Sequence, residues 1–247
     1  MKKIIAVLLV CLTTPLMAQK LHYFRVNLSP KFENYTVTGN ENVNALFHMD
    51  VGASVLVGKR FTPNWYGELG LLKNDYSAKF DILTQNNLGA DYRWFDEDLY
   101  PTFTSSQLLL NGGYRHAHSQ LVSFYGGVGL QIFLSKKLSR DGTQLHIRES
   151  VIEVDGVREQ IAINTFSNGL EAGNFLVRAD AGIFLKVSKS LSVDLGVTAR
   201  TSTNSLNEFE IEYSSTSQPE KQRAVIATSG AGLSLNIGFK YQIAAFE

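Results

Sequence analysis

Alternation of apolar and polar residues is the dominant pattern of this sequence, and residues 121–134, LVSFYGGVGLQIFL, show it clearly. One face of this segment carries valine, leucine, isoleucine and phenylalanine, and the other carries Ser123, Tyr125, Gln131 and glycines. Because successive side chains of a strand point to opposite faces, the pattern predicts a strand with one apolar and one polar face. At about a dozen residues, it is longer than the roughly 5–6 residues of a usual soluble strand.

Eight segments repeat this pattern, and we predict a strand in each. They are residues 21–31, 47–60, 65–75, 102–115, 121–135, 174–187, 191–202 and 228–243. Short connections alternate strictly with long ones. The short ones are 62–64, 116–120 and 188–190, and the long ones are 32–46, 76–101, 136–173 and 203–227. Outer-membrane barrels have short periplasmic turns and long extracellular loops. The sequence therefore predicts an all-β fold, an eight-stranded antiparallel up-and-down transmembrane β-barrel.

Alternation does not tell which face points outward, because a soluble lipocalin-type barrel has eight strands with its apolar face inside. The polar face here consists mainly of glycine, serine and asparagine, which suit the narrow interior of an eight-stranded barrel. Aromatic residues also lie near the ends of the apolar faces, as expected at a lipid–water boundary. They are Phe47, Phe61, Trp65, Tyr114, Phe239 and Tyr241. Both observations favour a lipid-facing apolar surface over the soluble alternative.

A possible ninth and tenth strand lie in residues 144–154 and 157–166, joined by Asp155-Gly156. The Asp-Gly pair predicts a hairpin with a tight turn. Charged residues fall on both faces of this hairpin, and a charge that faces lipid costs roughly 2–4 kcal/mol near the midplane. We therefore predict that the hairpin lies above the membrane and that the barrel has eight strands, not ten.

The N-terminus predicts export. Residues 1–18 begin with two lysines, continue with an apolar stretch and end at Met17-Ala18, as a secretory signal peptide does. We expect cleavage near Ala18, so that residues 19–247 form the outer-membrane barrel domain. A lipoprotein alternative, with lipid on Cys11, is disfavoured because Val10 precedes it and the cysteine lies inside the apolar stretch. With 23 basic and 23 acidic residues, no net charge favours nucleic acid as a partner.

Several charged residues have the parity of the barrel interior, and we predict that they form a polar network in the lumen. Buried charges of both signs are tolerated when they are paired and hydrogen-bonded. The preferred interpretation is a plug that closes the barrel; the alternative is a gated ion path. The predicted network contains Arg25, Asp50, Glu68, Arg178, Asp180, Asp194 and Arg200.

The only hint of catalysis is the segment His116-Ala117-His118-Ser119. A histidine beside a serine can activate a nucleophile, and lipid A deacylases are barrels of this size that use such a pair. Here the segment forms a short periplasmic turn, on the opposite side from lipid A. The two histidines lack a nearby third ligand for a metal. We expect an ordinary polar turn, no enzymatic activity, no cofactor and no metal site.

The long loop at residues 91–100, DYRWFDEDLY, combines aromatic and acidic residues. Aromatic side chains with a polar group are common in recognition surfaces. Tyr92, Trp94, Phe95 and Tyr100 are therefore candidates for surface recognition. The alternative is that the loop packs its own aromatic residues against the rim of the barrel.

The pattern as a whole resembles the small outer-membrane β-barrel proteins of Gram-negative bacteria, and within them the generic family that includes PorT-like proteins of a secretion apparatus. The last strand, GLSLNIGFKYQI, is similar to the terminal strand that such barrels present to the barrel-assembly machinery. Here the chain continues through residues 244–247 instead of ending on an aromatic residue. The resemblance implies outer-membrane lipid, the assembly machinery and an envelope or surface protein as partners. A filled lumen favours a structural or surface-interaction role over a pore, and the PorT-like resemblance implies, as the alternative, an accessory role in secretion.

Overall fold

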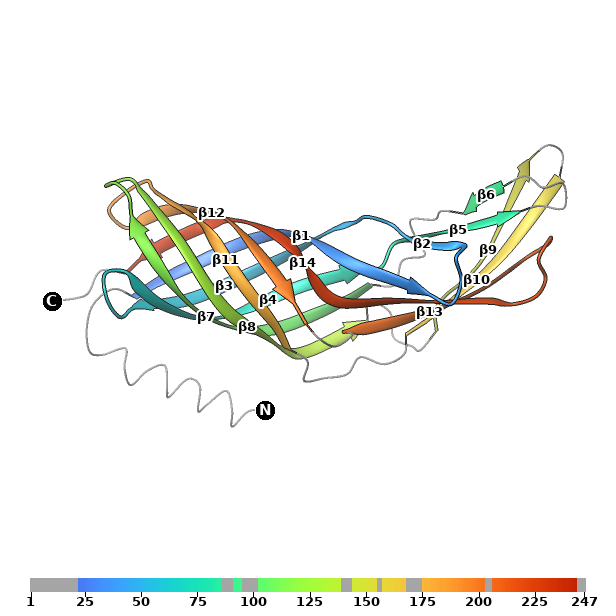
Figure 1. Ribbon diagram of the computed structural model, residues 1–247, viewed down its shortest axis with the longest axis horizontal. Coiled ribbons are helices and arrows are strands. Elements are labelled where there is room, and N and C mark those ends of the chain that lie inside the picture. Colours follow the sequence, from blue (N-terminus) through green and yellow to red (C-terminus); the bar gives the residue numbers. More distant parts are fainter. Residues whose placement is uncertain are drawn as a thin grey trace.

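The computed structural model describes residues 22–85, 91–94, 102–138, 144–154, 157–167, 175–202 and 206–243. Within these ranges fourteen strands form two antiparallel sheets (Figure 1). The small sheet contains β2 (Val43–Ala45), β5 (Phe80–Gln85) and β6 (Asp91–Trp94). The large sheet contains β1 (His22–Thr38), β3 (Met49–Arg60), β4 (Trp65–Ser77), β7 (Thr102–Ala117), β8 (Val122–Leu138), β9 (Gln144–Val154), β10 (Val157–Ser167), β11 (Phe175–Lys186), β12 (Leu191–Thr201), β13 (Asn207–Ser215) and β14 (Gln222–Gln242). No helix in these ranges is long and apolar enough to span a membrane.

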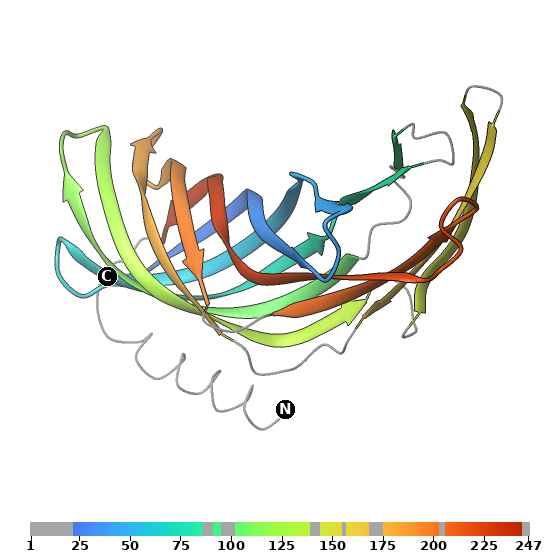
Figure 2. The same cartoon turned by 45° about the vertical axis from the view of Figure 1, so that its right-hand side comes forward.

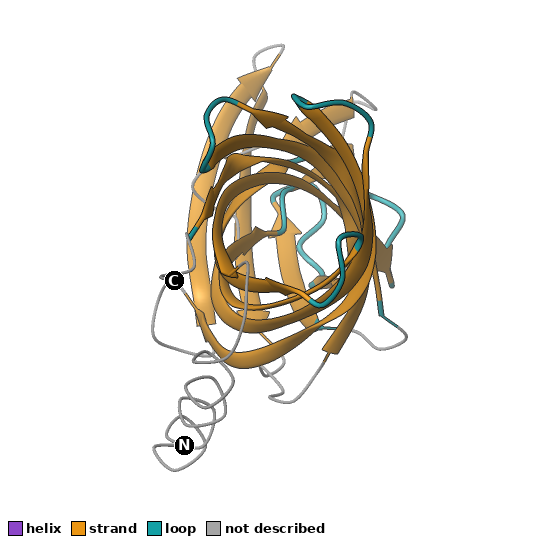
Figure 3. Ribbon diagram, turned by 90° about the vertical axis from the view of Figure 1, so that its left-hand side faces the viewer, coloured by secondary structure: helices purple, strands orange, loops and turns teal. Residues whose placement is uncertain are grey.

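Eight strands of the large sheet close into a barrel, in the order β1-β3-β4-β7-β8-β11-β12-β14 (Figure 3). The ring closes because β14 also pairs with β1, with Tyr23 opposite Gln242 at one end and Thr38 opposite Val225 at the other. Each of the eight predicted strands coincides with one strand of this ring, so the predicted fold and strand count are confirmed. The predicted signal peptide, residues 1–18, lies outside the described residues.

The two faces of the barrel strands are oriented as predicted. On β1, Arg25 and Asn27 are buried in the lumen, whereas Phe24, Val26 and Leu28 are exposed on the outside. The same pattern continues around the ring and leaves a belt of exposed valine, leucine, isoleucine and phenylalanine side chains. Soluble monomers rarely expose apolar patches of this extent, whereas a lipid bilayer would cover them. The lipocalin-type alternative is therefore wrong.

Aromatic residues lie at both ends of this belt, also as predicted. Phe47 and Phe61 are among the most exposed apolar side chains, at 81% and 69%. Trp65 packs edge-to-face on Tyr114, with 5.4 Å between the ring centroids. Inside the barrel, glycines make room for large polar side chains: a Cβ atom at Gly58 would overlap the ring of Tyr23.

The sheet continues beyond the barrel at the end that carries the long connections (Figure 2). β14 is 21 residues long. Its C-terminal half pairs with β12, from Gly232 to Tyr241, and its N-terminal half pairs with β13. β13 in turn pairs with β10, and β10 with β9. The predicted hairpin of residues 144–166 is thus present as β9 and β10, outside the closed ring.

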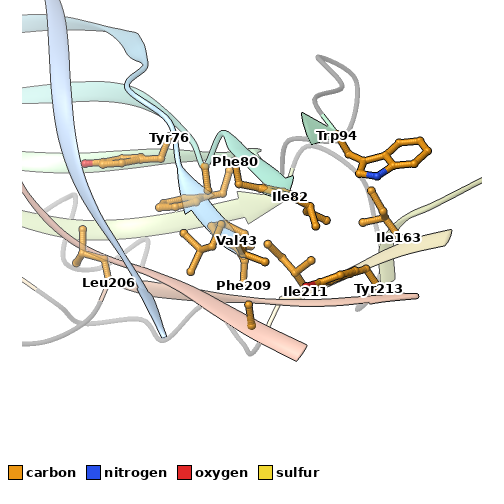
Figure 4. Packing of buried hydrophobic residues seen from close by; sticks show 14 of the residues in the cluster. Val43, Tyr76, Phe80, Ile82, Trp94, Ile163, Leu206, Phe209, Ile211 and Tyr213 are labelled. Atoms are coloured by element: carbon orange, nitrogen blue, oxygen red, sulfur yellow. The ribbon is translucent and has the colours of Figure 1, made fainter. Parts of the chain in front are cut away.

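The long connections are more ordered than predicted. The segment 203–227, expected to be irregular, contains β13 and the start of β14. The segment 32–46 contains the end of β1 and all of β2. A hydrophobic cluster lies between the extended sheet and the small sheet (Figure 4). This outer cluster contains Val43, Tyr76, Ala78, Phe80, Ile82, Trp94, Phe103, Phe133, Ile161, Ile163, Leu176, Leu206, Phe209, Ile211, Tyr213, Ala224 and Ile226. The molecule therefore has a second core above the barrel.

Candidate functional site

The lumen is closed by polar side chains that lie in three layers. The first layer, nearest the short turns, is built around Arg25. Its Nε atom lies 2.5 Å from Asp194 Oδ2 and one terminal nitrogen lies 3.1 Å from Glu68 Oε2. The other terminal nitrogen donates to the hydroxyl of Tyr125, which donates to Asp194 in turn. Glu68 also accepts hydrogen bonds from Tyr23 and Asn111.

This first layer is fully enclosed. The side chains of Arg25, Glu68 and Asp194 are at most 2% exposed. Charges this far from bulk water are stable only when their partners replace the lost hydration. Arg25 supplies that compensation to two carboxylates at once, in a planar geometry that suits carboxylate oxygens.

The second layer connects four strands. Arg178 Nε donates to Asp180 Oδ2 at 3.1 Å, and Asp180 also accepts from the hydroxyl of Thr198. Asn236 donates to the same hydroxyl at 2.8 Å, and Ser29 donates to the Asn236 amide oxygen at 2.9 Å. The chain of hydrogen bonds therefore links the four neighbouring strands β11, β12, β14 and β1.

The third layer lies at the top of the barrel and contains residues that the sequence analysis missed. Glu33 lies 3.0 Å from Arg200 and 3.1 Å from Lys31. The Lys31 ammonium lies 3.2 Å from the centre of the Tyr76 ring. Asp50 accepts a hydrogen bond from the backbone N–H of Ser77 at 3.1 Å.

The seven predicted lumen residues are therefore all buried, but they do not form one connected network. Arg25, Glu68 and Asp194 share the first layer, and Arg178 and Asp180 share the second. Arg200 and Asp50 lie at the top with different partners. Lys31, Glu33 and Lys240 were missed, although each lies an even number of residues from an inward-facing residue of its own strand, Arg25 for the first two and Asn236 for the third.

The space left between these layers is small. A cavity of about 20 Å³ lies among Ser29, Gln131, Arg178 and Asn236. That volume holds about one water molecule. The arrangement suits a plug.

The segment His116–Ser119 has the geometry of a turn. Ser119 Oγ accepts hydrogen bonds from the backbone N–H groups of Leu121 and Val122, at 3.2 and 3.0 Å. The ring of His118 packs edge-to-face on Phe124, with centroids 5.6 Å apart. Within the described ranges, no group of three histidine, cysteine or acidic side chains is arranged to hold a metal ion.

The candidate recognition residues are only partly within the described ranges. Trp94, on β6, is 7% exposed and packs in the outer cluster (Figure 4), and its indole N–H donates to Thr84 Oγ1 at 2.7 Å. For Trp94 the structure favours the alternative, an aromatic residue that packs within the protein, because a large apolar ring is better buried than hydrated. Tyr92 belongs to the same strand, but its side chain is outside the description, as are Phe95 and Tyr100.

The fold is similar to that of the outer membrane protein OprG from Pseudomonas aeruginosa. The TM-score is 0.53 at 10% sequence identity, and the match covers 91% of this chain and 96% of that one. A de novo designed transmembrane β-barrel matches with a TM-score of 0.35 at 13% identity, covering 92% of this chain and 100% of that one. The β-domain of the Bordetella autotransporter BrkA matches with a TM-score of 0.27 at 8% identity, covering 90% and 99%. No protein-family model and no curated protein sequence matches this chain. The likeness to OprG supports the eight-stranded barrel fold.

Proposed function

We propose that this protein is an integral outer-membrane β-barrel with a surface-interaction role. In this proposal the barrel is an anchor, and the extended sheet of β14, β13, β10 and β9 is the binding platform. The membrane location is supported by the exposed apolar belt and by the likeness in fold to OprG, an outer membrane protein. The predicted signal peptide of residues 1–18 and the terminal strand that resembles an assembly signal support the same location.

The observation that carries the proposal is the free edge of β9. In the described part of the chain the large sheet ends at β9, which pairs only with β10. An unpaired strand edge presents a row of N–H and C=O groups to which an extended segment of another protein can add. Residues of β10, β13 and β14 in this platform belong to the outer cluster. We therefore propose a protein partner that adds a strand to β9.

The layered lumen argues against a pore as the main function. Each arginine of the three layers lies beside a carboxylate, and the cavity between them holds about one water molecule. The turn geometry of Ser119 argues against a serine nucleophile at the only catalytic candidate. We accordingly propose a non-enzymatic protein that works without a cofactor.

The resemblance to PorT-like proteins supports a second role, an accessory component of an envelope secretion machine. The two roles predict different partners. A machine component should co-purify with envelope proteins in fixed stoichiometry, whereas a surface-interaction barrel should recruit its partner from outside the cell. Purification of the intact protein in mild detergent separates these outcomes.

The proposal can be tested by photo-crosslinking in intact cells. A photoreactive residue at position 150, on β9, should form an adduct with a partner protein. The matched control is position 208, an exposed site on β13 in the middle of the same sheet, and it should give no adduct. Deletion of residues 144–166 should abolish binding of the protein that crosslinks to position 150. The barrel should remain folded, as judged by heat-modifiable gel migration. Equal crosslinking from both positions, or none from position 150 in the presence of bound partner, would contradict the proposal.

A further inference from the structure

The mouth of the barrel at the short-turn end contains a cavity of about 250 Å³. It lies below the first lumen layer, between the ends of the barrel strands and the turns of residues 117–121 and 187–190. Five cationic side chains line it, and none of its described lining residues is acidic. The cations are Arg60, Arg115, Lys186, Lys189 and Lys240. This mouth cavity is thus positively charged on several sides.

The innermost cations lack the partners that cations have elsewhere in the lumen. Arg25, Arg178 and Arg200 each lie within 3.1 Å of a carboxylate oxygen. Lys240 is 5% exposed and, among the described residues, forms no ion pair. Its ammonium lies 3.5 Å from the centre of the Tyr23 ring instead. The nearest layer offers no spare carboxylate, because Glu68 and Asp194 are already engaged by Arg25.

The two arginines of the cavity also have unused donors. The Nε atoms of Arg60 and Arg115 are buried without a hydrogen-bond partner. A terminal nitrogen of Arg115 donates to Ser123 Oγ at 2.7 Å, which fixes its side chain at the wall of the cavity. A buried donor without an acceptor is unfavourable, and more so when the group is charged. Donors and charges held in place without partners are what a complementary anion would satisfy.

We propose that the mouth cavity binds a small anion that carries a phosphate group. Arginine side chains bind phosphate oxygens through paired N–H donors, and lysines add charge without a strict geometry. The serine hydroxyls of the lining, from Ser123, Ser190 and Ser192, provide further donors. The volume suits a free phosphate or a small phosphate ester. This site is separate from the β9 edge, so an experiment can refute either proposal without refuting the other.

The test uses the full mature protein in a neutral detergent at constant ionic strength. Titration with inorganic phosphate, followed by calorimetry, should show saturable binding, and sodium chloride should show none. Arg60→Gln and Arg115→Gln should each weaken phosphate binding at least tenfold. The matched control is Lys59→Gln, which removes the same charge from the adjacent residue, outside the lining of the mouth cavity, and should leave binding unchanged.

A second variant guards against failure to fold. Lys186 and Lys189 are exposed, so the double change Lys186→Gln/Lys189→Gln should fold normally and still weaken phosphate binding. Two sources of phosphate are distinguished by nanodiscs of phosphatidic acid compared with phosphatidylcholine. Competition of phosphatidic acid with inorganic phosphate would assign the site to a lipid headgroup, and absence of competition would assign it to a soluble phosphate. Succinate that binds as tightly as phosphate, or a Lys59→Gln effect equal to that of Arg60→Gln, would overturn the proposal.

Discussion

Arg25 is the residue on which the first lumen layer depends, because it faces two buried carboxylates. Its guanidinium contacts Asp194 at 2.5 Å and Glu68 at 3.1 Å, so its loss would leave both carboxylates without this cation. Removing one member of a buried ion pair leaves an uncompensated charge, at a cost of about 3–5 kcal/mol. Removing all the charges together can leave the free energy of unfolding almost unchanged.

We therefore predict that Arg25→Met lowers the free energy of unfolding by about 3–5 kcal/mol, measured by urea denaturation of the barrel in lipid vesicles. The triple variant Arg25→Met/Glu68→Gln/Asp194→Asn should recover most of that loss, since it removes all three charges of the first layer. Lys137→Met, which removes an exposed charge from β8, is the control and should change stability by less than about 1 kcal/mol. A triple variant less stable than Arg25→Met alone would argue against this account.

Which charges face the lumen could be predicted from parity alone, but their pairing could not. On a strand, odd and even positions face opposite sides, so Arg25 and Asp194 were assigned to the interior directly. Their contact joins residues 169 positions apart and depends on the register of β1, β14 and β12. Lys31 and Glu33 were missed for a different reason. Lys31 was the last residue of the expected strand 21–31 and Glu33 lay beyond it, whereas β1 continues to Thr38.

At the scale of the elements, β13 is a strand that the sequence analysis did not predict. Its sequence, NEFEIEYSS, alternates as clearly as any barrel strand, with Phe209, Ile211 and Tyr213 on one face. Glu208, Glu210 and Glu212 occupy the other face, and a strand with three acidic residues on one side does not suit a barrel wall. The segment falls in the connection 203–227, which was predicted only as a long loop. The alternation is that of a strand, but β13 lies outside the closed ring, between β14 and β10.

The acidic face of β13 predicts a pH response of the β13–β14 hairpin. Lys221 Nζ lies 2.6 Å from one carboxylate oxygen of Glu212, and Arg223 lies 3.1 Å from the other. The hydrogen bond from Lys221, together with the charges of Lys221 and Arg223, lowers the pKa of Glu212 below its ordinary value of 4.5. A carboxylate with a depressed pKa stabilises the fold above its ordinary pKa, and the stabilisation is lost as the pH falls through the depressed value.

We therefore predict that the hairpin loosens below about pH 4.5 and is unaffected between pH 5 and 7. Hydrogen exchange of residues 207–228, corrected for the intrinsic pH dependence of exchange, should show the loss of protection. Glu212→Gln should weaken protection at neutral pH and remove the pH response. Glu208→Gln, an exposed change on the same strand, is the control and should keep the response. A response that persists in Glu212→Gln would show that another group is responsible.

At the scale of the whole molecule, the part that the sequence predicts is the ring whose outer face is apolar. The part that it does not predict is the sheet structure beyond that ring. The ring of eight strands follows from the sequence because every lipid-facing position must be apolar and every strand edge must be paired within the membrane. A segment in water is under neither requirement, because water can hydrate polar side chains and unpaired strand edges. The small sheet of β2, β5 and β6 therefore left only short and ambiguous patterns, and Trp94 could not be assigned to the outer cluster in advance.

The closed lumen makes a prediction about the whole barrel, namely that it does not conduct. An eight-stranded barrel is only wide enough for its own side chains, and here three layers of paired charges fill it. In planar lipid bilayers the purified protein should show no discrete conductance steps, whereas a porin of 16 strands, reconstituted in parallel, should show them.

The double variant Arg178→Ala/Asp180→Ala tests the layered arrangement, because it removes both charges of the second layer and leaves the first and third layers intact. This variant should also stay closed, since ions would still have to pass Arg25 and Arg200. Steps of porin size from the unmodified protein would mean that the layers move apart in the membrane, and the gated ion path would then be the better interpretation of the lumen.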